Sequence, residues 1–346
     1  MSAPPSLSPR RVALIGGGLA GACAAWALAR RGCEVTLFER DRIASGASGA
    51  AVGALQPLLG MRLSLRSLNY EGFLRTSSLV RELLVEGRTW RQPGVLRLAL
   101  QDELAERWSG VMERLPAGLA SWKEPADCRA LEPRLSDRVR AGVWIPEGKF
   151  VDIPALIGAL LSHADARVYE GVGVRGLDAS ATGVSLTLDS GERACFDEVV
   201  VCSGAQAPEP LRGESLTLAP YMGVLAAYGG VDAPRVALSH RGYISAWRDG
   251  SVLVGTVDRR PPFEDEPSAA TIEELRGRLE AVLGPQPDAH LLKVWCGVRP
   301  ALADHEPVVR RSSSLERAWI FTGFGGRGLL MGPLLSESLA AELCGA

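Results

Sequence analysis

Lysine is scarce in this chain of 346 residues: among 38 basic side chains, only Lys123, Lys149 and Lys293 are lysines. The basic side chains are balanced by 40 acidic ones, and the net charge of −2 gives no whole-chain sign of a nucleic-acid binder. Hydrophobic residues make up 47% of the chain, which excludes an intrinsically disordered protein. The length suits one large or two ordinary globular domains.

Cysteine and histidine are also few and scattered. The seven cysteines contain no Cys-x-x-Cys pair, and the four histidines do not stand near them at the spacing of a metal site. An odd number of cysteines in mostly apolar surroundings favours free thiols in a reducing compartment over disulfides. We therefore expect no metal, no disulfide framework and no cysteine nucleophile.

Long apolar runs are absent apart from residues 12–29, which carry no charge and follow Arg10 and Arg11. This run superficially matches a twin-arginine or secretory signal, or a short membrane span. It contains four glycines, however, and changes halfway from a β-like to an alanine-rich composition. A β-rich segment that ends in an acidic residue follows it. We expect a cytoplasmic protein that has no membrane partner.

Residues 16–21 form the pattern Gly-x-Gly-x-x-Gly between a predicted strand at 12–15 and a predicted helix at 19–31. Gly16 permits a tight turn, and Gly21 lets the helix and the strand pack closely. Gly18 lets a pyrophosphate approach the backbone where Leu19 and Ala20 begin the helix. The alternative is a glycine-rich turn with a structural role alone.

A second predicted strand at 33–38 is closed by Glu39, 18 residues after Gly21. There its carboxylate would accept hydrogen bonds from the ribose hydroxyls of an adenosine, with Arg40 beside it. An acidic residue at this position argues against a cofactor that carries a 2′-phosphate. The context of strand, turn, helix and strand therefore predicts dinucleotide binding.

The following segment, residues 43–59, is rich in small residues and by itself would be a flexible linker. From Gly46 to Leu59 the sequence resembles the FAD-dependent D-amino-acid-oxidase-like superfamily, which includes glycine, sarcosine and D-amino-acid oxidases. It is most similar to the oxidase half of the bifunctional bacterial enzyme that completes the methylaminomethyl group of the tRNA wobble uridine. The resemblance implies that this loop wraps FAD, through Ala47, Ser48, Gly53 and Ala54.

Further segments are similar to the same family. Residues 148–156 resemble the segment at which the chain of relatives returns to the FAD-binding domain. Val174 stands at the position whose backbone contacts adenine in relatives. Ser203 and Gly204 end a predicted strand in a turn like the one beside the dinucleotide. Residues 322–333 resemble the flavin-contacting turn, before a predicted helix at 334–343. The N–H groups of this turn would suit the electron-rich edge of a reduced flavin; they belong to Gly325, Gly326, Arg327, Gly328 and Leu329.

These patterns together predict an α/β fold. A Rossmann-like FAD-binding domain with a parallel sheet is interleaved with a substrate-binding domain on a mixed or antiparallel sheet. We expect the FAD-binding domain at residues 1–59, 148–210 and 295–346, and the substrate-binding domain at 60–147 and 211–294. In the latter we expect a helix pair that starts near residue 63, a strand around 94–100 and strands within 216–257, followed by a helix at 271–283.

The resemblance implies oxidation of a C–N bond in a glycine-like amino acid or secondary amine. A hydride equivalent would pass to flavin N5, the imine would hydrolyse, and oxygen would be the acceptor, giving hydrogen peroxide. Arg299 matches the arginine that holds the substrate carboxylate in relatives, and its alternative is a salt bridge with Asp304 or Glu306. Tyr243 stands where related sheets project residues toward the flavin, although an ordinary sheet tyrosine is the alternative.

We expect non-covalent FAD, because Gly297 aligns with the flavin-linked cysteine of the sarcosine-oxidase branch and Cys296 is one position away. The glycine-oxidase branch has a second carboxylate-binding arginine where this chain has Gly326. The tRNA-enzyme branch has the Gly-x-Arg-Gly pattern found here.

Three functions stay open: oxidation of a small amino acid or amine, oxidation of the carboxymethylaminomethyl group on tRNA, and an FAD-binding dehydrogenase subunit that passes electrons to a partner. Residues 46–59 and 323–333 favour the tRNA branch. The near-neutral charge weighs against tRNA, and the length leaves no room for the methyltransferase domain. A dehydrogenase that binds only NAD leaves both segments unexplained.

Overall fold

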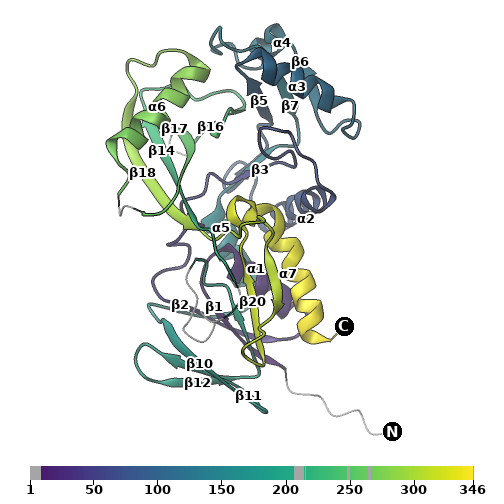
Figure 1. Cartoon of the computed structure of the whole chain (residues 1–346), viewed down its shortest axis with the longest axis vertical. Coiled ribbons are helices and arrows are strands. Elements are labelled where there is room, and N and C mark those ends of the chain that lie inside the picture. Colours follow the sequence, from purple (N-terminus) through teal and green to yellow (C-terminus); the bar gives the residue numbers. More distant parts are fainter. Residues whose placement is uncertain (1–8, 206–213, 215, 248–249, 264–265, 346) are drawn as a thin grey trace. The chain divides into compact units, whose positions relative to one another are not determined.

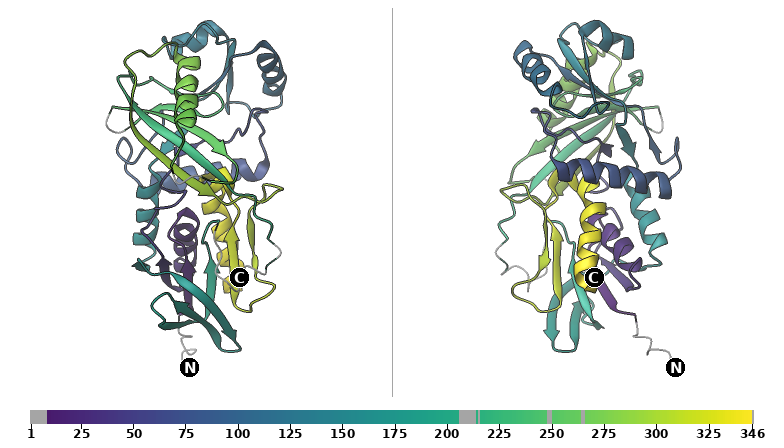
Figure 2. Two further views of the ribbon diagram at one scale, coloured as in Figure 1. Left: turned by 60° about the vertical axis from the view of Figure 1, so that its left-hand side comes forward. Right: turned by 90° about the vertical axis from the view of Figure 1, so that its right-hand side faces the viewer.

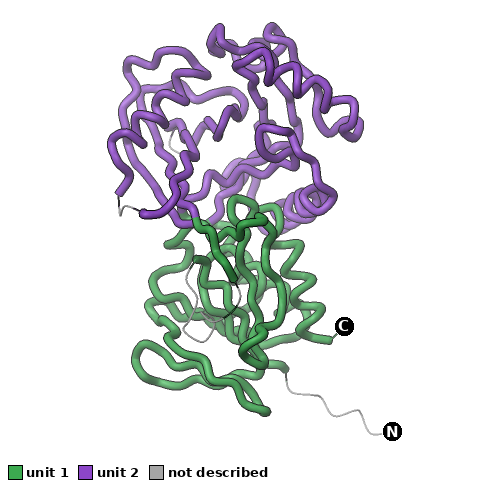
Figure 3. The backbone as a smooth tube through the Cα atoms, in the orientation of Figure 1, with its two compact units in different colours: residues 1–49, 154–220, 299–346 green, residues 50–153, 221–298 purple. Residues whose placement is uncertain are grey.

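The computed structural model describes residues 9–205, 214, 216–247, 250–263 and 266–345. It divides into two compact units, shown in different colours in Figure 3. The first unit contains residues 1–49, 154–220 and 299–346, and the second contains residues 50–153 and 221–298. The two units alternate along the chain, and the first boundary between them lies after Gly49.

The first unit is built on a six-stranded sheet with the order β19-β20-β13-β1-β2-β9. Strands β1, β2 and β20 of this sheet are labelled in Figure 1. All pairs in this sheet are parallel except β19 with β20. The predicted α/β fold with a parallel sheet is therefore confirmed. The strands are β1 (Arg11–Ile15), β2 (Glu34–Glu39), β9 (Arg167–Glu170), β13 (Glu198–Val201), β19 (Val308–Arg311) and β20 (Ala318–Thr322).

Different elements pack on the two faces of this sheet. Ala13 and Ile15 of β1 pack in a buried cluster with residues of a three-stranded antiparallel sheet. That sheet consists of β10 (Val174–Ser180), β11 (Gly183–Leu188) and β12 (Arg193–Phe196). Leu37 of β2 faces the other way, toward α1 (Leu19–Ala29). Helix α1 lies side by side with α7 (Gly328–Cys344), as Figure 2 shows.

Helix α7 begins six residues before the predicted helix start, so the prediction that placed Pro333 outside the helix is wrong. Proline lacks an N–H and forfeits one helical hydrogen bond, which is why the sequence favoured a later start. Packing against α1 outweighs that loss: Gly332 is buried, and a Cβ there would lie 3.3 Å from Cys23 Sγ.

The second unit is built on an eight-stranded mixed sheet with the order β18-β14-β17-β16-β15-β5-β7-β6. Strands β15 and β5 pair in parallel, and the antiparallel pairs include β14 with β17 and β5 with β7. The strands are β5 (Val95–Ala99), β6 (Ser121–Lys123), β7 (Ala141–Ile145), β14 (Tyr221–Gly229), β15 (Ala237–Ser239), β16 (Tyr243–Ala246), β17 (Val252–Arg259) and β18 (His290–Arg299).

The two faces of the eight-stranded sheet belong to different buried clusters. Leu96 and Leu98 pack with α6 (Ala269–Leu283) and α4 (Pro125–Leu131). Val95 and Ala99 pack on the opposite face with α3 (Asp102–Met112) and with parts of residues 52–63. Side chains alternate between the two faces along β5, and Arg97 is two residues from both Val95 and Ala99. Arg97 therefore lies on the same face as these two residues although it is charged.

The remaining elements of the second unit are short strands and one long helix. A small sheet has the order β3-β8-β4, formed by β3 (Ala54–Leu55), β8 (Lys149–Val151) and β4 (Trp90–Arg91). The predicted helix pair is wrong, because a single helix, α2 (Ser67–Leu83), follows a turn at residues 60–63. Helix α5 (Ile153–His163) runs from this unit into the first one. Within the described residues, no helix has the length and apolarity to cross a bilayer.

Glu214 is a buried carboxylate of the first unit that binds the loop between β19 and β20. It accepts hydrogen bonds from Arg310 at 2.9 Å, from Ser312, and from both backbone and side chain of Ser313 and of Ser314. Burial by itself raises the pKa of this carboxyl group, but the hydrogen bonds outweigh burial and hold the pKa well below its usual range. The ionised carboxylate therefore stabilises the fold.

We predict that Glu214→Gln lowers the free energy of unfolding at pH 7 by about 2 kcal/mol, because its NH2 group cannot accept the serine hydrogen bonds. The folded-state pKa is depressed, so the contribution of Glu214 is complete above its unfolded pKa of about 4.3 and is lost as pH falls. Thermal denaturation from pH 7 to pH 3 should show the difference between the two proteins shrinking. The exposed Glu316 on the same loop is the matched control. Equal melting temperatures at pH 7 for wild type and Glu214→Gln would contradict the prediction.

Candidate functional site

Gly16, Gly18 and Gly21 differ in what surrounds them in the turn between β1 and α1. Gly16 has φ +113°, and a Cβ there would lie 2.6 Å from the carbonyl oxygen of Cys202. A Cβ on Gly21 would lie 2.1 Å from the carbonyl oxygen of Gly16, so packing requires glycine at both positions. A Cβ on Gly18 would meet within 4 Å only the Ser48 hydroxyl, at 3.1 Å. Packing alone therefore does not explain Gly18.

The N-terminus of α1 is suited to an anion. Gly18 occupies the N-cap position without a side-chain hydrogen bond, and the first turn contains no acidic residue. The N–H of Leu19 donates to the Ser48 hydroxyl at 3.0 Å, and the N–H of Ala20 follows in the same turn. The N–H groups of a first helical turn and the helix dipole together favour a phosphate at such a terminus.

Glu39 lies beside this turn, at the end of the neighbouring strand β2. Its carboxylate accepts hydrogen bonds from the N–H of Gly17 at 2.6 Å and from the N–H of Asp41 at 2.9 Å. A carboxylate has about four acceptor positions, so capacity remains for two ribose hydroxyls. Arg40 is exposed and lies 3.6 Å from Asp41.

The loop that contains Ala47 and Ser48 folds back onto the glycine turn. The N–H of Ala44 donates to the carbonyl of Gly17 at 3.0 Å, and Ser48 accepts from Leu19. Two hydrogen bonds therefore tie the loop to the turn, whereas a flexible linker would have none. Gly53 and Ala54 belong to the second unit, at the start of β3. Gly53 has φ +74°, and a Cβ there would lie 2.0 Å from a carbonyl oxygen of β8.

Ser203 and Gly204 follow β13, next to the end of β1. The N–H of Cys202 donates to the carbonyl of Ile15 at 2.8 Å, and the Thr322 hydroxyl at the end of β20 donates to the carbonyl of Gly204 at 3.1 Å. The chain order of the sheet reverses between β13 and β1. Such a reversal, at the carboxyl ends of parallel strands, is where open α/β sheets bind ligands.

The C-terminal glycine turn also reaches this edge. Gly325, Gly326 and Arg327 form a short 3-10 turn, after which Gly328 and Leu329 begin α7. A Cβ on Gly328 would lie 3.9 Å from the Leu19 side chain, so the N-termini of α1 and α7 are neighbours.

Arg299 is brought to this turn by the backbone. It is half-buried at the end of β18, and the carbonyl of the next residue, Pro300, accepts a hydrogen bond from the N–H of Gly325 at 2.7 Å. Arg327 Nη2 lies 3.8 Å from Glu306 Oε2, and this buried nitrogen has no hydrogen-bond partner among the described residues.

Val174 begins β10, and a backbone hydrogen bond just before it holds the chain close to the end of β2. The N–H of Val172 donates to the carbonyl of Glu39 at 2.9 Å, and Val174 is two residues further along. Val174 therefore stands near Glu39, which we expect to bind the adenosine ribose. The predicted cofactor residues of the first unit thus gather at one edge of its sheet.

Tyr243 lies in the second unit, at the start of β16, where it packs edge-on against Phe150. Its hydroxyl accepts a hydrogen bond from Gln56 Nε2 at 3.1 Å. Gln56 and the buried Arg97 belong to the same polar cluster, and the sequence analysis missed both residues. A signal existed for Arg97, because it is the one charged residue of the otherwise apolar strand β5.

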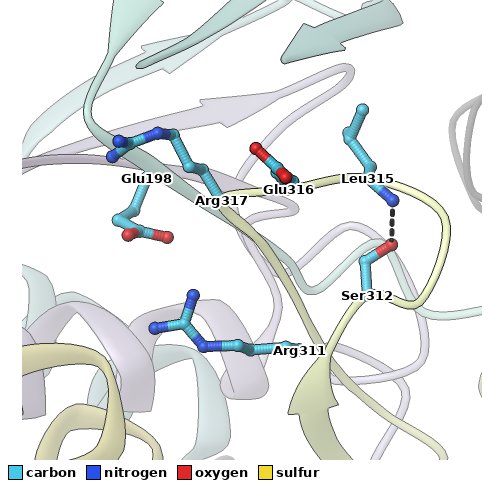
Figure 4. Close-up of a pocket in the computed structure, with 6 residues that line it drawn as sticks. All are labelled: Glu198, Arg311, Ser312, Leu315, Glu316 and Arg317. Atoms are coloured by element: carbon cyan, nitrogen blue, oxygen red, sulfur yellow. Dashed lines mark hydrogen bonds between the residues drawn. The ribbon is translucent and has the colours of Figure 1, made fainter. Parts of the chain in front are cut away.

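A surface depression with a volume of about 460 Å³ lies elsewhere in the first unit (Figure 4). Its lining includes Glu198 at the start of β13 and Arg317 just before β20, together with Ser312, whose hydroxyl accepts from the N–H of Leu315. The depression therefore lies at the amino ends of the parallel strands, opposite the edge that carries the glycine turns. Ligand sites of such sheets lie at the carboxyl ends, so we assign it no role.

Cys23 and Cys202 are buried cysteines of the first unit. Burial raises the pKa of the Cys23 and Cys202 thiols far above the usual range, which makes them inert. Within the part of the chain that the structure describes, no three His, Cys, Asp or Glu side chains are grouped as a metal would require.

The fold and this edge define a dinucleotide-binding α/β protein: a helix N-terminus with glycine as its N-cap, where packing does not require a glycine, and an acid at the next strand both fit an adenine dinucleotide. The family model described as FAD dependent oxidoreductase matches residues 11–342, and the chain belongs to this family. The predictions of the family and of FAD as the cofactor are thereby confirmed.

Curated relatives include two kinds of enzyme. The chain is 30% identical, over 99% of its length, to the tRNA 5-methylaminomethyl-2-thiouridine biosynthesis bifunctional protein MnmC of Chromohalobacter salexigens, and it spans 55% of that relative. It is 28% identical to the glycine oxidase of Geobacillus kaustophilus, covering 96% of this chain and 92% of the relative. The crystal structure of glycine oxidase from Geobacillus kaustophilus superposes with a TM-score of 0.83 at 25% identity, over 97% of this chain and 95% of that one.

We predict that Gly18→Ala lowers the affinity for FAD at least about tenfold while the fold is kept, because a methyl group there meets only a hydroxyl of the protein but would block a pyrophosphate. Titration of the apoprotein with FAD, followed by fluorescence, measures the affinity. Since we expect non-covalent FAD, acid precipitation should release the flavin of the wild type into the supernatant. Gly21→Ala is the contrasting variant, because it should also lower the melting temperature of the apoprotein. Unchanged FAD affinity in Gly18→Ala would refute the assignment.

Proposed function

We propose that this protein oxidises the C–N bond of a glycine-like amino acid or secondary amine to an imine, with oxygen as the electron acceptor. In this proposal the first unit holds FAD and carries Arg299. The protein's relatives support it, since the glycine oxidase of Geobacillus kaustophilus matches over nearly its whole length. The observation that carries the proposal is the hydrogen bond from Gly325 to Pro300, because it fixes Arg299 beside the turn expected to contact the flavin.

Bound FAD would supply the chemistry, by accepting a hydride equivalent from the carbon next to nitrogen. The task of the protein is then to orient the substrate, and it requires no nucleophile of its own. Arg299 would pair with the substrate carboxylate through two parallel hydrogen bonds, which fixes the position of the neighbouring carbon. The N–H groups of residues 325–329 would face the flavin edge that becomes more negative on reduction.

A second candidate substrate is the carboxymethylaminomethyl group of a tRNA uridine. The 30% identity to the bifunctional protein MnmC over 99% of the chain favours it. This group also contains a glycine unit, so the same oxidation applies. The chain's net charge of −2 offers no general attraction for RNA.

A panel of substrates distinguishes the candidates. We expect glycine, sarcosine or a D-amino acid to bleach the flavin absorption of the purified protein in the absence of oxygen, and peroxide to form once air is admitted. Bleaching by modified tRNA alone would favour the second candidate. Bleaching without peroxide would indicate a dehydrogenase that passes electrons to a partner. If no amine and no tRNA bleaches the flavin, the proposed function is wrong.

We predict that Arg299→Met raises KM for the substrate about 30-fold or more, because a charge-assisted bidentate pair is lost, while the FAD content stays unchanged. Arg299→Lys should recover part of the loss, because lysine keeps the charge without the bidentate geometry. Steady-state kinetics with the best substrate of the panel measures both. The exposed Arg311, the last residue of β19 in the six-stranded sheet, is the control for removing an arginine. A KM within twofold of wild type in Arg299→Met would exclude the carboxylate role.

A further inference from the structure

Two half-buried cysteines of the first unit, Cys33 and Cys344, are in contact. Their Sγ atoms lie 3.6 Å apart, although the two residues are 311 positions apart in the sequence. Both side chains are free thiols, and both are partly accessible to solvent. Because of the long separation, no local spacing pattern in the sequence reveals this pair.

The contact joins the far ends of two helices that lie side by side. Cys33 follows α1, after a turn in which Gly32 has φ +80°, and its N–H donates to the carbonyl of Leu28 at 3.2 Å. Cys344 is the last residue of α7. Both helices begin at the edge that carries the glycine turns, and α1 with its 11 residues is about 16 Å long. The cysteine pair is therefore a separate place from the expected cofactor edge.

Arg10 connects the two segments that carry the cysteines. Its backbone carbonyl accepts a hydrogen bond at 2.9 Å from the N–H of Glu34, the residue directly after Cys33. Its guanidinium Nη1 donates to the carbonyl of Leu343, the residue directly before Cys344. Arg10 thus fixes both segments and adds a positive charge beside the thiols. Such a charge favours the thiolate, which is the reactive form of cysteine.

The two sulfur atoms differ in which of them keeps its proton. Burial, and after it the hydrogen bond with Cys344, raises the pKa of the Cys33 thiol to about 12. The positive charges of Arg10 and Arg31 act in the opposite direction but do not outweigh these effects. Cys33 is therefore the donor in the contact, and the sulfur of Cys344 is the acceptor. A sulfur that accepts a hydrogen bond is stabilised as a thiolate.

We propose that Cys33 and Cys344 are a modification site, at which hydrogen peroxide converts the two thiols to a disulfide that ties the end of α7 to the turn after α1. The Cys344 thiolate attacks one oxygen of the peroxide and becomes a sulfenic acid, while the O–O bond breaks and hydroxide leaves. The Cys33 sulfur then attacks the sulfenic sulfur. The hydroxide that is displaced takes up the Cys33 proton. Overall, the two thiols lose two electrons and two protons, and the peroxide is reduced to two water molecules.

The disulfide would stabilise the first unit. A bond between residues 311 positions apart strongly restricts the unfolded chain. To form it, the two sulfur atoms must approach each other by about 1.5 Å, a shift of the size that side-chain rotation provides. Peroxide is also the product expected from the proposed function, but the site requires only the oxidant. It would make Cys344 a nucleophile, which the composition did not predict.

The first test exposes the FAD-loaded protein to a small excess of hydrogen peroxide and follows its intact mass. We expect the wild type to lose the mass of two hydrogen atoms, and proteolytic mapping to find residues 33 and 344 in one linked peptide. The melting temperature should rise by about 5 °C or more and return to its first value after reduction with dithiothreitol. Cys195→Ser is the matched control, because Cys195 is an exposed thiol of the same unit, and it should leave these results unchanged.

Single variants separate the roles of the residues. In Cys33→Ser, sulfenic acid at residue 344 should accumulate and be trapped by dimedone. In Cys344→Ser, trapping at residue 33 should be about tenfold lower or less, because the remaining thiol keeps its proton. Arg10→Met should slow disulfide formation about threefold or more, because the positive charge beside the thiols is lost. Arg11→Met is its control, because the Arg11 guanidinium lies over the Phe196 ring, 6.0 Å from the ring centroid.

Several outcomes would overturn the proposal. A wild type that keeps both thiols, adds oxygen to them without linking them, or links either one to another cysteine would exclude the site. Equal trapping in the two cysteine variants would contradict the order of the two steps. An unchanged melting temperature of the linked protein would exclude the stabilising role. None of these measurements involves an amine substrate, so their failure and the failure of the proposed function are distinguishable.

Discussion

The close approach of α1 to the end of β1 is the constraint on which the rest of the first unit depends. The carbonyl oxygen of Gly16 occupies the space where a side chain at position 21 would begin. This contact sets where the N-terminus of α1 points, and the turn before it can then lie against the end of β13. Because α1 is buried on nearly all sides, α7 packs along it through Gly332 and brings its own N-terminus to the same edge.

Three long-range hydrogen bonds then assemble the edge from distant parts of the chain. Gly17 binds Glu39, Thr322 binds Gly204, and Gly325 binds Pro300. The alternation of the two units makes this possible, because each return of the chain to the first unit delivers a strand end or a turn to the same edge. Arg299 is the clearest case: it ends a strand of the eight-stranded sheet and is also the first residue of the last segment of the first unit.

The sequence predicted the features that local patterns encode. The glycine spacing and Glu39 gave the first strand, helix and strand within one or two residues, and the structure brings the first unit's predicted cofactor residues together. The predicted start of α7 was wrong because the helical hydrogen bond that Pro333 cannot form is a local effect. The packing that compensates for it comes from α1, far away in the sequence. Gln56 and Arg97 were missed because their partners lie far along the chain, and no local pattern encodes such a cluster.

Arg299, as proposed, would bind a group that both candidate substrates share. A free amino acid and a uridine-borne glycine unit carry the same carboxylate, so this contact would not distinguish them. The two substrates differ in what is attached to the nitrogen. Under the proposed function, discrimination between them would therefore depend on the room left around the amine for a nucleotide.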